Sequence, residues 1–343
     1  MLYEYCVIGN GLIGAATALE LARKSKAVCV LGAAYGQQDR YYSSHEDDSR
    51  IARFWHNDPY WEDLARCNAP MLEALAGAAR LPVFKRTPVF YSYPAGAAPA
   101  GARLRISTHG PHATHFQYED MWGGIIDPKA YIAALNQQAR KHNATVVQCI
   151  VQETRWKDGK AVIGTTAGEI HSKRIVDARG MHFDGEAAGL ETTVVGKILL
   201  YVELAAQRPV PPYCFVDSSC RSDQFEDVYG IACYKASGDR LVSKFGFSER
   251  EPVRLRSAEE IAAWFQSGYR CYPYLSQAKE LLKNFCGDKA AQVHAKPCAF
   301  VTTSDRRPII SLDEHLCTIT GCNGMAAKCC QALAQKVVGM WNA

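Results

Sequence analysis

The chain has 343 residues, of which 48% are hydrophobic and 22% charged, and a formal net charge of +4. This length exceeds what one hydrophobic core usually supports, so two domains are expected. The small, scattered charge argues against nucleic-acid binding. No apolar stretch approaches the roughly 18 residues of a membrane span, and a first strand that begins by Tyr3 leaves no room for a signal peptide. We therefore expect a soluble cytoplasmic protein with no membrane contact.

The N-terminal segment contains a Gly-x-Gly-x-x-Gly motif formed by Gly9, Gly11 and Gly14. A short apolar strand precedes the motif and an alanine-rich helix follows it, as in dinucleotide-binding folds. The first Gly allows a tight turn, the second lets a pyrophosphate approach the backbone, and the third lets the helix pack against the strand. The sequence therefore predicts an α/β fold with a Rossmann-type nucleotide site. The alternative is a glycine-rich turn without a ligand.

The second strand, over residues 27–31, ends at Gly32, where such folds usually carry an Asp or Glu for the adenosine ribose. Either other groups hold the ribose, such as backbone amides of residues 33–38, or the site departs from the standard geometry. A freely exchanging NAD depends on that carboxylate more than a cofactor that is anchored in additional ways. The missing carboxylate therefore disfavours NAD.

The later elements interrupt the nucleotide-binding pattern and then resume it. In chain order we expect a helix over 61–75 kinked or split at Pro70, a strand over 87–93, a helix from Asp127 through Ala139, strands over 145–180, antiparallel strands over 194–245, helices over 257–286, and a return to the nucleotide domain from Cys298. This interleaved layout resembles that of FAD amine oxidases. The resemblance implies a discontinuous FAD-binding domain (1–84, 126–192 and 291–343) and an antiparallel-sheet substrate-binding domain (85–125 and 193–290).

The cysteines and histidines give no metal or redox pattern. The 14 cysteines include no C-x-x-C pair, so most are interpreted as reduced and structural. His109, His112 and His115 have metal-like spacing, but they lie in a Gly/Pro-containing loop without a fixed acidic partner. We interpret them as surface or pocket-lid residues, and no metal is predicted.

Three further segments carry a family resemblance. Residues 43–53 resemble the S-x-H-G-D-x-R-I-x-R stretch of the monomeric sarcosine oxidase and N-methyltryptophan oxidase family, within the D-amino acid oxidase superfamily. Residues 296–305 are similar to that family's C-x-Y-x-x-T-P-D segment, and residues 321–328 to its G-x-x-G-x-x-x-K segment. With the glycine motif these segments make four landmarks in the family's order, spanning nearly the whole chain.

The resemblance implies how FAD is held. It assigns cofactor binding to a set that comprises Gly9, Gly11, Gly14, Ser44, Arg50, Cys298, Gly321, Gly324 and Lys328. Arg50 matches the arginine that lies against the flavin ring, and Cys298 matches the cysteine that carries the flavin through a thioether. Two positions of the Cys298 segment depart from the family pattern, because Phe300 replaces a tyrosine and Ser304 a proline. The alternative for Cys298 is one more buried strand cysteine.

The resemblance also implies a substrate carboxylate site. Arg53 can hold a carboxylate in a bidentate contact and Lys328 can supply a point charge, as the matching family residues do. A helix over this stretch would bring Arg50 and Arg53 close together. The alternative is that both arginines pair with the acidic residues 46–48.

Two residues are expected to act near the flavin. Lys244 matches the family lysine that activates dioxygen, where an ammonium stabilises the developing negative charge. Tyr229 resembles a substrate-pocket tyrosine, while Ser248 stands where the family often has a histidine. The alternative for Lys244 is an exposed strand lysine.

These observations predict FAD-dependent oxidation of the C–N bond of a small secondary or cyclic amino acid to an imine, with oxygen reduced to hydrogen peroxide. The expected partners are this small-molecule substrate and oxygen, and the chain is expected to act as a monomer. One alternative is a flavin-dependent dehydrogenase or desaturase in a biosynthetic pathway. Another is a nicotinamide-dependent reductase or a flavin-fold protein that binds without turnover.

Overall fold

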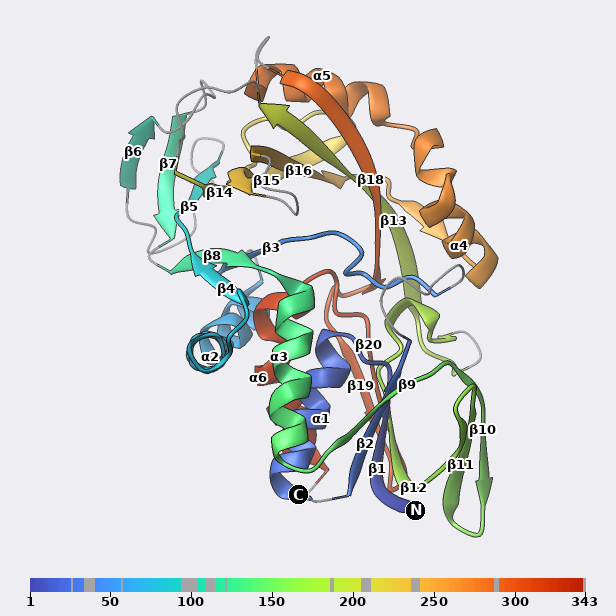
Figure 1. Ribbon diagram of the computed structural model, residues 1–343. Coiled ribbons are helices and arrows are strands. Elements are labelled where there is room, and N and C mark those ends of the chain that lie inside the picture. Colours follow the sequence, from blue (N-terminus) through green and yellow to red (C-terminus); the bar gives the residue numbers. More distant parts are fainter. Residues whose placement is uncertain are drawn as a thin grey trace.

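The computed structural model describes residues 1–25, 27–33, 41–56, 58–93, 104–108, 115–120, 122–185, 188–204, 211–235, 241–286 and 290–341. Two large sheets lie one above the other, and most of the helices pack against their faces (Figure 1). The N-terminal strand belongs to the lower sheet in that view, and the helix near the C-terminus packs beside it. None of the described helices combines the length and apolar character needed to cross a membrane.

The first sheet carries the glycine motif at the end of its N-terminal strand. Its strand order is β10 (Val151–Lys157), β11 (Lys160–Thr165), β12 (Gly168–Asp177), β1 (Leu2–Ile8), β2 (Val28–Gly32) and β9 (Thr145–Gln148), with β20 (Leu316–Thr320) beside β12 and β19 (Ile309–Leu312) beside β20. β1 pairs in parallel with β12 and β2, and β2 with β9. The carboxyl ends of these parallel strands share one edge, which is where ligands bind in open α/β sheets.

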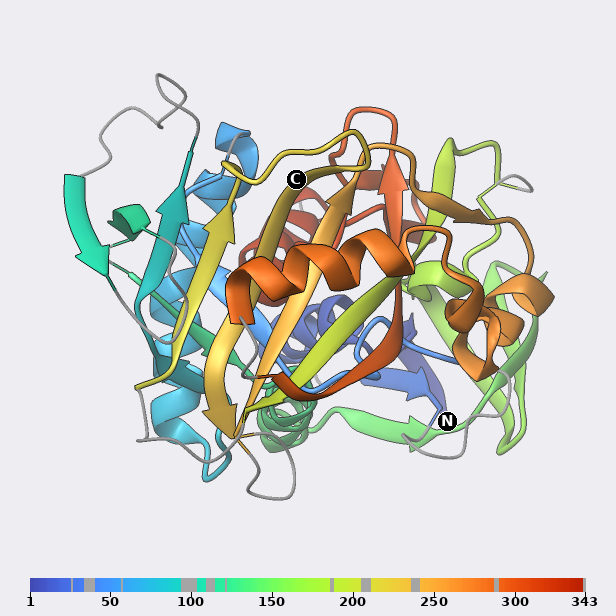
Figure 2. The same ribbon diagram turned by 90° about the horizontal axis from the view of Figure 1, so that it is seen from above.

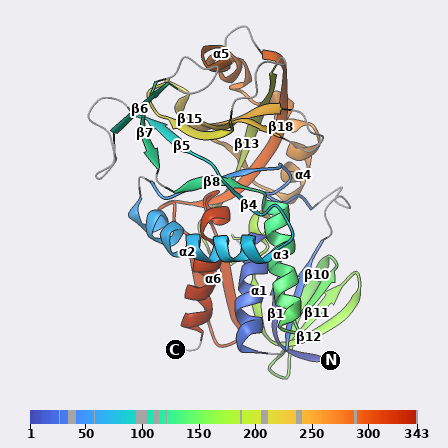
Figure 3. The same cartoon turned by 60° about the vertical axis from the view of Figure 1, so that its left-hand side comes forward.

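Four helices lie beside this sheet: α1 (Leu12–Lys24), α2 (Pro59–Ala78), α3 (Pro128–Lys141) and α6 (Ala326–Met340). In Figure 3, α1, α3 and α6 run side by side and α2 crosses them. Leu19, Leu72, Leu135 and Leu333, one from each helix, are fully buried in their common core. Of the two predicted effects of Pro70, a split is wrong, because α2 continues through this residue, and a kink stays a prediction. Pro70 is on the exposed side, where water can satisfy the carbonyl that loses its intrahelical partner.

The second sheet is larger and mostly antiparallel. Its strand order is β17 (Val253–Leu255), β13 (Thr192–Leu204), β16 (Leu241–Glu249), β15 (Phe225–Lys235), β14 (Tyr213–Asp217), β5 (Val89–Ser92), β7 (His115–Asp120) and β6 (Leu104–Thr108), with β18 (Ala290–Thr303) beside β13. The β14 and β5 pair is parallel, which the prediction of an antiparallel sheet did not include. Helices α4 (Ala258–Gln266) and α5 (Leu275–Cys286) cover its outer face, and α5 crosses above the strands in Figure 2. The opposite face looks toward the first sheet.

A small third sheet joins the two regions. It contains β3 (Arg50–Arg53), β8 (Gly123–Ile126) and β4 (Phe84–Arg86). Residues 50–53 form a strand and not the helix considered from the sequence, because they pair with β8 along their whole length. A Cβ on Gly123 would lie 2.3 Å from Val89 Cγ2, so glycine at this position allows β8 to approach β5 of the second sheet. Side chains three residues apart on a strand point to opposite faces, so Arg50 and Arg53 diverge.

Two short 3₁₀ segments, η1 (Gly180–His182) and η2 (Gly268–Cys271), complete the described elements. The predicted α/β class is confirmed by the parallel sheet with its helices and by the second, mainly antiparallel sheet. The assignment of the residue ranges to an FAD-binding and a substrate-binding domain stays a prediction.

Candidate functional site

A cavity of about 740 Å³ opens between the first and second sheets. Its lining comes from residues 8–13 at the end of β1, residues 41–53, the strands β13, β15, β16 and β18, and residues 319–328 before and within α6. This volume lies in the usual range for small-molecule sites. All the residues that the sequence assigned to cofactor, substrate or catalysis line this cavity, except Gly14, which lies just behind it.

The glycine motif shapes one end of the cavity. Gly9 has a φ of +104°, and a Cβ there would lie 2.3 Å from the carbonyl oxygen of Ala178. A Cβ on Gly14 would lie 1.7 Å from the carbonyl oxygen of Gly9, so the helix packs directly on the turn. The nearest atom to a Cβ on Gly11 is His45 Nε2 at 3.8 Å, which leaves room above the turn. The N-terminal amides of α1 therefore face open space suited to an anionic pyrophosphate.

Gly32 has a structural reason for lacking a carboxylate. A Cβ at this position would lie 2.5 Å from Asn10 Cβ and 2.9 Å from Asn10 N. The Asn10 side chain is fixed there, since its Oδ1 accepts a hydrogen bond from Asn136 Nδ2 at 3.0 Å. Asn10 and Asn136 thus fill part of the space beside the second strand. Most of the loop suggested for the ribose, residues 34–38, lies outside the described residues.

A second glycine turn precedes α6. Gly321 and Gly324 both have a φ of +70°, a conformation that disfavours other residues. A Cβ on Gly321 would also lie 2.4 Å from Thr303 Cγ2. Between the two glycines, the Asn323 amide donates to the Val301 carbonyl at 2.9 Å, which ties the turn to β18. The turn aims the N-terminal end of α6 into the cavity.

Lys328 lies in the first turn of α6 and presents a buried ammonium without a partner. Its side chain is only 3% exposed, and Nζ has no hydrogen-bond partner in the described structure. Burial, together with the positive charge of Arg53, lowers the pKa of Lys328 to about 7. An unpaired buried cation is unfavourable, so an anionic ligand would relieve it.

Arg53 is a second cation of the cavity that has no acidic partner among the described residues. Its guanidinium lies 5.8 Å from the centre of the Tyr91 ring, and no carboxylate of the described residues forms an ion pair with it. Burial opposes its charge, but Tyr91 and Tyr93 raise its pKa. The alternative that Arg53 pairs with the acidic residues 46–48 is therefore wrong. Arg53 and Lys328 together form a cationic site inside the cavity.

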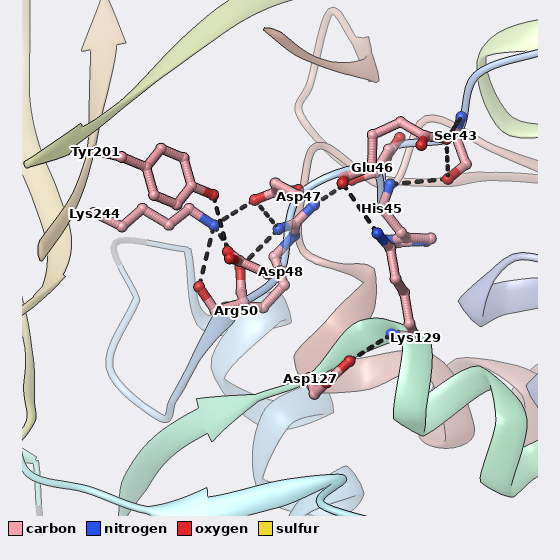
Figure 4. A network of polar contacts seen from close by, with 12 residues as sticks. Ser43, His45, Glu46, Asp47, Asp48, Arg50, Asp127, Lys129, Tyr201 and Lys244 are labelled. Atoms are coloured by element: carbon pink, nitrogen blue, oxygen red, sulfur yellow. Dashed lines mark hydrogen bonds and ion pairs between the residues drawn. The ribbon is translucent and has the colours of Figure 1, made fainter. Parts of the chain in front are cut away.

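Arg50 behaves differently, because it does pair with a neighbouring acid. Figure 4 shows its guanidinium beside the Asp47 carboxylate, and Nη1 also donates to the Ser49 carbonyl at 2.7 Å. Nη2 donates to the Ser44 carbonyl, which holds the 44–50 loop closed. Burial would raise the pKa of Asp47, but Arg50 and Lys244 keep it well below its usual range.

Lys244 reaches the same carboxylate from β16. Its Nζ donates to Asp47 Oδ2, to the Ser49 carbonyl at 2.6 Å and, more weakly, to Ser49 Oγ at 3.4 Å (Figure 4). Burial lowers its pKa although Asp47 raises it. The alternative of an exposed strand lysine is wrong, since Lys244 is buried. An ammonium has three donors, and protein acceptors contact all three.

Tyr229 and Cys298 belong to the cavity wall made by the second sheet. A Cβ on Gly246 would lie 2.4 Å from Tyr229 Cζ, so the missing side chain makes room for this ring. Cys298 faces Lys197 across the β13 and β18 pair. Burial and the charge of Asp47 raise the pKa of the Cys298 thiol to about 11, while nearby cations oppose this shift.

Sequence reasoning missed several polar residues of the cavity. Lys197 is buried and forms an ion pair with Glu249 at 2.6 Å, and Asp227 accepts a hydrogen bond from Ser248 at 2.6 Å. His45 is buried, its Nδ1 has no partner within the described structure, and burial lowers its pKa to about 3. His45 stands in the quoted family segment, which was a usable signal. Lys197, Glu249 and Asp227 meet their partners only through strand pairing, which single-sequence patterns do not reveal. Ser248 was noted from the sequence, but only as a departure from the family's histidine.

Two of the three histidines with metal-like spacing, His109 and His112, lie outside the described residues. His115 begins β7, but its side chain is also outside the description. Among the described side chains, no three His, Cys, Asp or Glu residues gather in a way that would hold a metal ion.

The comparisons with solved structures give the same overall fold. NikD, described as an unusual amino acid oxidase essential for nikkomycin biosynthesis, aligns in its open form over 97% of this chain and 94% of its own, with 18% identity and a TM-score of 0.73. L-proline dehydrogenase from P. horikoshii covers 98% of this chain and 92% of its own at 15% identity and a TM-score of 0.69. Glycine oxidase from Geobacillus kaustophilus covers 99% and 95% at 18% identity and a TM-score of 0.63. At these identities the likeness concerns the fold.

A family model supplies the assignment that the structures alone do not. No curated protein matches the sequence in a direct comparison. The model of the DAO family, described as FAD dependent oxidoreductase, matches residues 4–340. The cavity fits this cofactor, since it joins a glycine turn open to a pyrophosphate with two helix N-termini and an unpaired ammonium. The chain therefore belongs to the DAO family of FAD-dependent oxidoreductases.

Proposed function

We propose that this protein oxidises the C–N bond of a small secondary or cyclic amino acid to an imine. The observation that carries the proposal is the pair of cations formed by the half-buried Arg53 and the buried Lys328, with no carboxylate of the described residues paired to either. A substrate carboxylate would supply the missing anion. The similar structures include an amino acid oxidase, a proline dehydrogenase and a glycine oxidase, which agrees with an amino acid substrate.

The cofactor would lie along the cavity from the first glycine turn to the second. Gly9, Gly11 and Gly14 would admit its pyrophosphate, and residues Ser44, Arg50, Cys298, Gly321 and Gly324 would surround the rest. FAD supplies the electron-accepting chemistry that the protein side chains lack. The protein contributes the position of the substrate, the exclusion of water and the fixed charges. Family membership disfavours the nicotinamide-dependent alternative.

We further propose that oxygen is the final acceptor and that hydrogen peroxide is formed, with Lys244 stabilising the charge that develops on oxygen. One observation favours the second candidate, a flavin-dependent dehydrogenase. Asp47 and Ser49 already accept the hydrogen bonds of the Lys244 ammonium, and Asp47 balances its charge. A lysine so occupied would favour oxygen reduction less than a free ammonium.

The finer relationship, to sarcosine and N-methyltryptophan oxidases, depends on Cys298. We propose that its thiol would form a thioether with the 8-methyl carbon of the flavin, as the family resemblance implies. The S–H bond and one methyl C–H bond would break, and the two electrons and two protons released would pass to the flavin ring and from it to oxygen. Acid-precipitated protein should then stay yellow, and its intact mass should exceed the sequence mass by one FAD. Cys298→Ser should release all flavin on denaturation. Colour found wholly in the supernatant of the wild-type precipitate would contradict the tether and leave the fold and the amine chemistry unaffected.

The test of the proposed function is an anaerobic screen of N-methyl and cyclic amino acids for bleaching of the flavin absorbance. At least one compound should bleach the flavin completely. Admitting oxygen should restore the absorbance and produce peroxide if oxygen is the acceptor. Bleaching without rapid recovery would favour the dehydrogenase. Failure of every amino acid to bleach the flavin would contradict the proposal. A monomeric state and a cytoplasmic location stay predictions.

A further inference from the structure

The part of the cavity wall formed by β15 and β16 carries a carboxylate that uses only one of its two oxygens in a described hydrogen bond. Asp227 lies on β15 and faces Ser248 on β16, and both residues line the cavity. Ser248 Oγ donates to Asp227 Oδ1 at 2.6 Å. The second carboxylate oxygen has no hydrogen-bond partner in the described part of the chain. One charged acceptor atom is therefore available to a ligand.

No nearby cation takes up this acceptor. Lys197 Nζ is held by Glu249 Oε2 at 2.6 Å and by the Phe247 carbonyl at 2.5 Å. Arg53 lies close enough to act on Asp227 electrostatically, but the described contacts include no ion pair between them. Burial raises the pKa of Asp227, whereas Ser248, Arg53 and Lys197 lower it. The carboxylate is thus held in place without being neutralised by contact.

The strand register places Asp227 away from the lysine end of the wall. Lys244, Gly246 and Ser248 alternate along β16 and all line the cavity, so they share one face. Four residues of strand span about 13 Å, so the Ser248 and Asp227 pair is separated by that distance from the backbone of Lys244. The ring of Tyr229 fills the interval over Gly246.

Arg53 acts electrostatically on both Lys328 and Asp227, which line the same cavity. Its charge lowers the pKa of Lys328 on one side and that of Asp227 on the other. Arg53, Lys328 and Asp227 line the same cavity, so a substrate whose carboxylate contacts Arg53 and Lys328 would extend its remaining atoms into the space that Asp227 also lines. A lone carboxylate oxygen there is costly to bury against an apolar group, but it forms a strong hydrogen bond with an N–H or O–H donor.

We propose that Asp227, positioned by Ser248, accepts a hydrogen bond from the distal part of the substrate and so selects amino acids whose ring or side chain carries an amine or hydroxyl group. This inference rests on the proposed function and adds a substrate class to it. It also assigns a role to Ser248, the position at which the chain departs from the family's histidine.

The experiment uses pairs of compounds that differ only in the donor. Proline is compared with 4-hydroxyproline, and pipecolate with piperazine-2-carboxylate. Binding to the flavin-loaded protein is measured by the perturbation of the flavin spectrum, and turnover by anaerobic bleaching. The proteins are wild type, Asp227→Asn and Ser248→Ala. Asp223→Asn, an exposed position before β15, is the matched control. Thermal unfolding and flavin content check that each variant is folded.

Wild type and the Asp223→Asn control should bind the donor-bearing member of at least one pair roughly ten- to a hundredfold more tightly than its partner. Asp227→Asn should lose this preference while keeping the affinity for the partner that lacks the donor. Equal affinity for both members of every pair in wild type would overturn the assignment. So would an equal loss for both members in Asp227→Asn, because Asp227 would then act on a group common to all substrates. Absence of bleaching by any compound would contradict the proposed function, while the binding preference decides separately on Asp227.

Discussion

Two buried lysines line the same cavity and differ in what surrounds them. Lys244, on β16, contacts the Asp47 carboxylate and two oxygens of Ser49. Lys328, on α6, has no hydrogen-bond partner among the described residues, and the charge that most affects its pKa is the cation of Arg53. The Asp47 carboxylate balances the charge of Lys244, whereas Lys328 lies in the field of a second positive charge, that of Arg53.

This difference indicates which end of the cavity awaits a ligand. A buried ammonium usually has a partner, and a folded protein keeps an unpaired one only at a cost in stability. The Lys244 end is complete without a ligand and ties the 44–50 loop to the second sheet. We propose that an anion completes the Lys328 end. Three predictions follow from this contrast.

The largest effect is expected from removing a cation of the unpaired end. Arg53→Ala or Lys328→Ala should raise KM steeply and leave flavin binding intact, because the substrate carboxylate loses a desolvated partner at a cost on the order of 2–5 kcal/mol. Steady-state kinetics with the best amino acid from the screen measures this. Lys336→Ala, on the same helix but exposed, is the control. Normal KM values in both variants would show that the carboxylate binds elsewhere.

A smaller and more selective effect is expected at the paired end. Lys244→Met should leave anaerobic bleaching by substrate nearly unchanged and slow reoxidation by oxygen roughly a hundredfold, comparable to losing one preorganised electrostatic group. Asp47 keeps Arg50 as its partner, so the loop should stay folded. Stopped-flow absorbance separates the two half-reactions, with the exposed Lys296→Met as control. Equal slowing of both half-reactions would assign Lys244 to substrate binding, and unchanged reoxidation would favour the dehydrogenase.

The pH dependence of ligand binding gives the smallest of the three effects. Burial and Arg53 lower the pKa of Lys328 from 10.5 to about 7. A non-reacting carboxylate binds the protonated form better, so its affinity should be constant below about pH 7 and fall by up to about tenfold per pH unit above it. Lys328→Met should remove this slope. A wild-type affinity that stays constant from pH 6 to 9 would contradict the assignment.

The same pKa predicts a pH dependence of stability with a definite sign. Between about pH 7 and 10.5 the unfolded chain holds a proton on Lys328 that the folded chain has released. The penalty of the buried charge is therefore fully present below pH 7, and the free protein gains stability as the pH rises through this window. Comparing urea unfolding of wild type and Lys328→Met across the window isolates this contribution.

Much of the fold could be predicted from local sequence. The glycine motif places its own strand, turn and helix, because each glycine answers a steric demand within a short stretch of chain. Residues 50–53 could not be assigned in this way. Their strand forms only because β8, which lies about 70 residues later, supplies a partner that pairs with it along its whole length.

The site shows the same limit. The sequence and the family resemblance brought Arg53 and Lys328 forward, and both line the cavity. The local pairing of Arg50 with Asp47 was the alternative considered from the sequence, and it is right for Arg50. Nothing in the sequence indicated that Lys244 would join Asp47, or that Asp227 would meet Ser248, since these contacts depend on how distant segments pair. Gly32 is a third case, because the steric reason for a glycine there is the close approach of Asn10, which local sequence does not reveal.

The central claim, that Arg53 and Lys328 receive a substrate carboxylate, is tested most directly by an anaerobic titration that compares one amino acid with its primary amide. The two compounds have the same amine and the same C–H bond and differ in the charge that the cations would bind. We expect the amide to need a roughly thirtyfold to several-thousandfold higher concentration to bleach the flavin, in keeping with a loss of about 2–5 kcal/mol. Equal bleaching by the amino acid and its amide would contradict it.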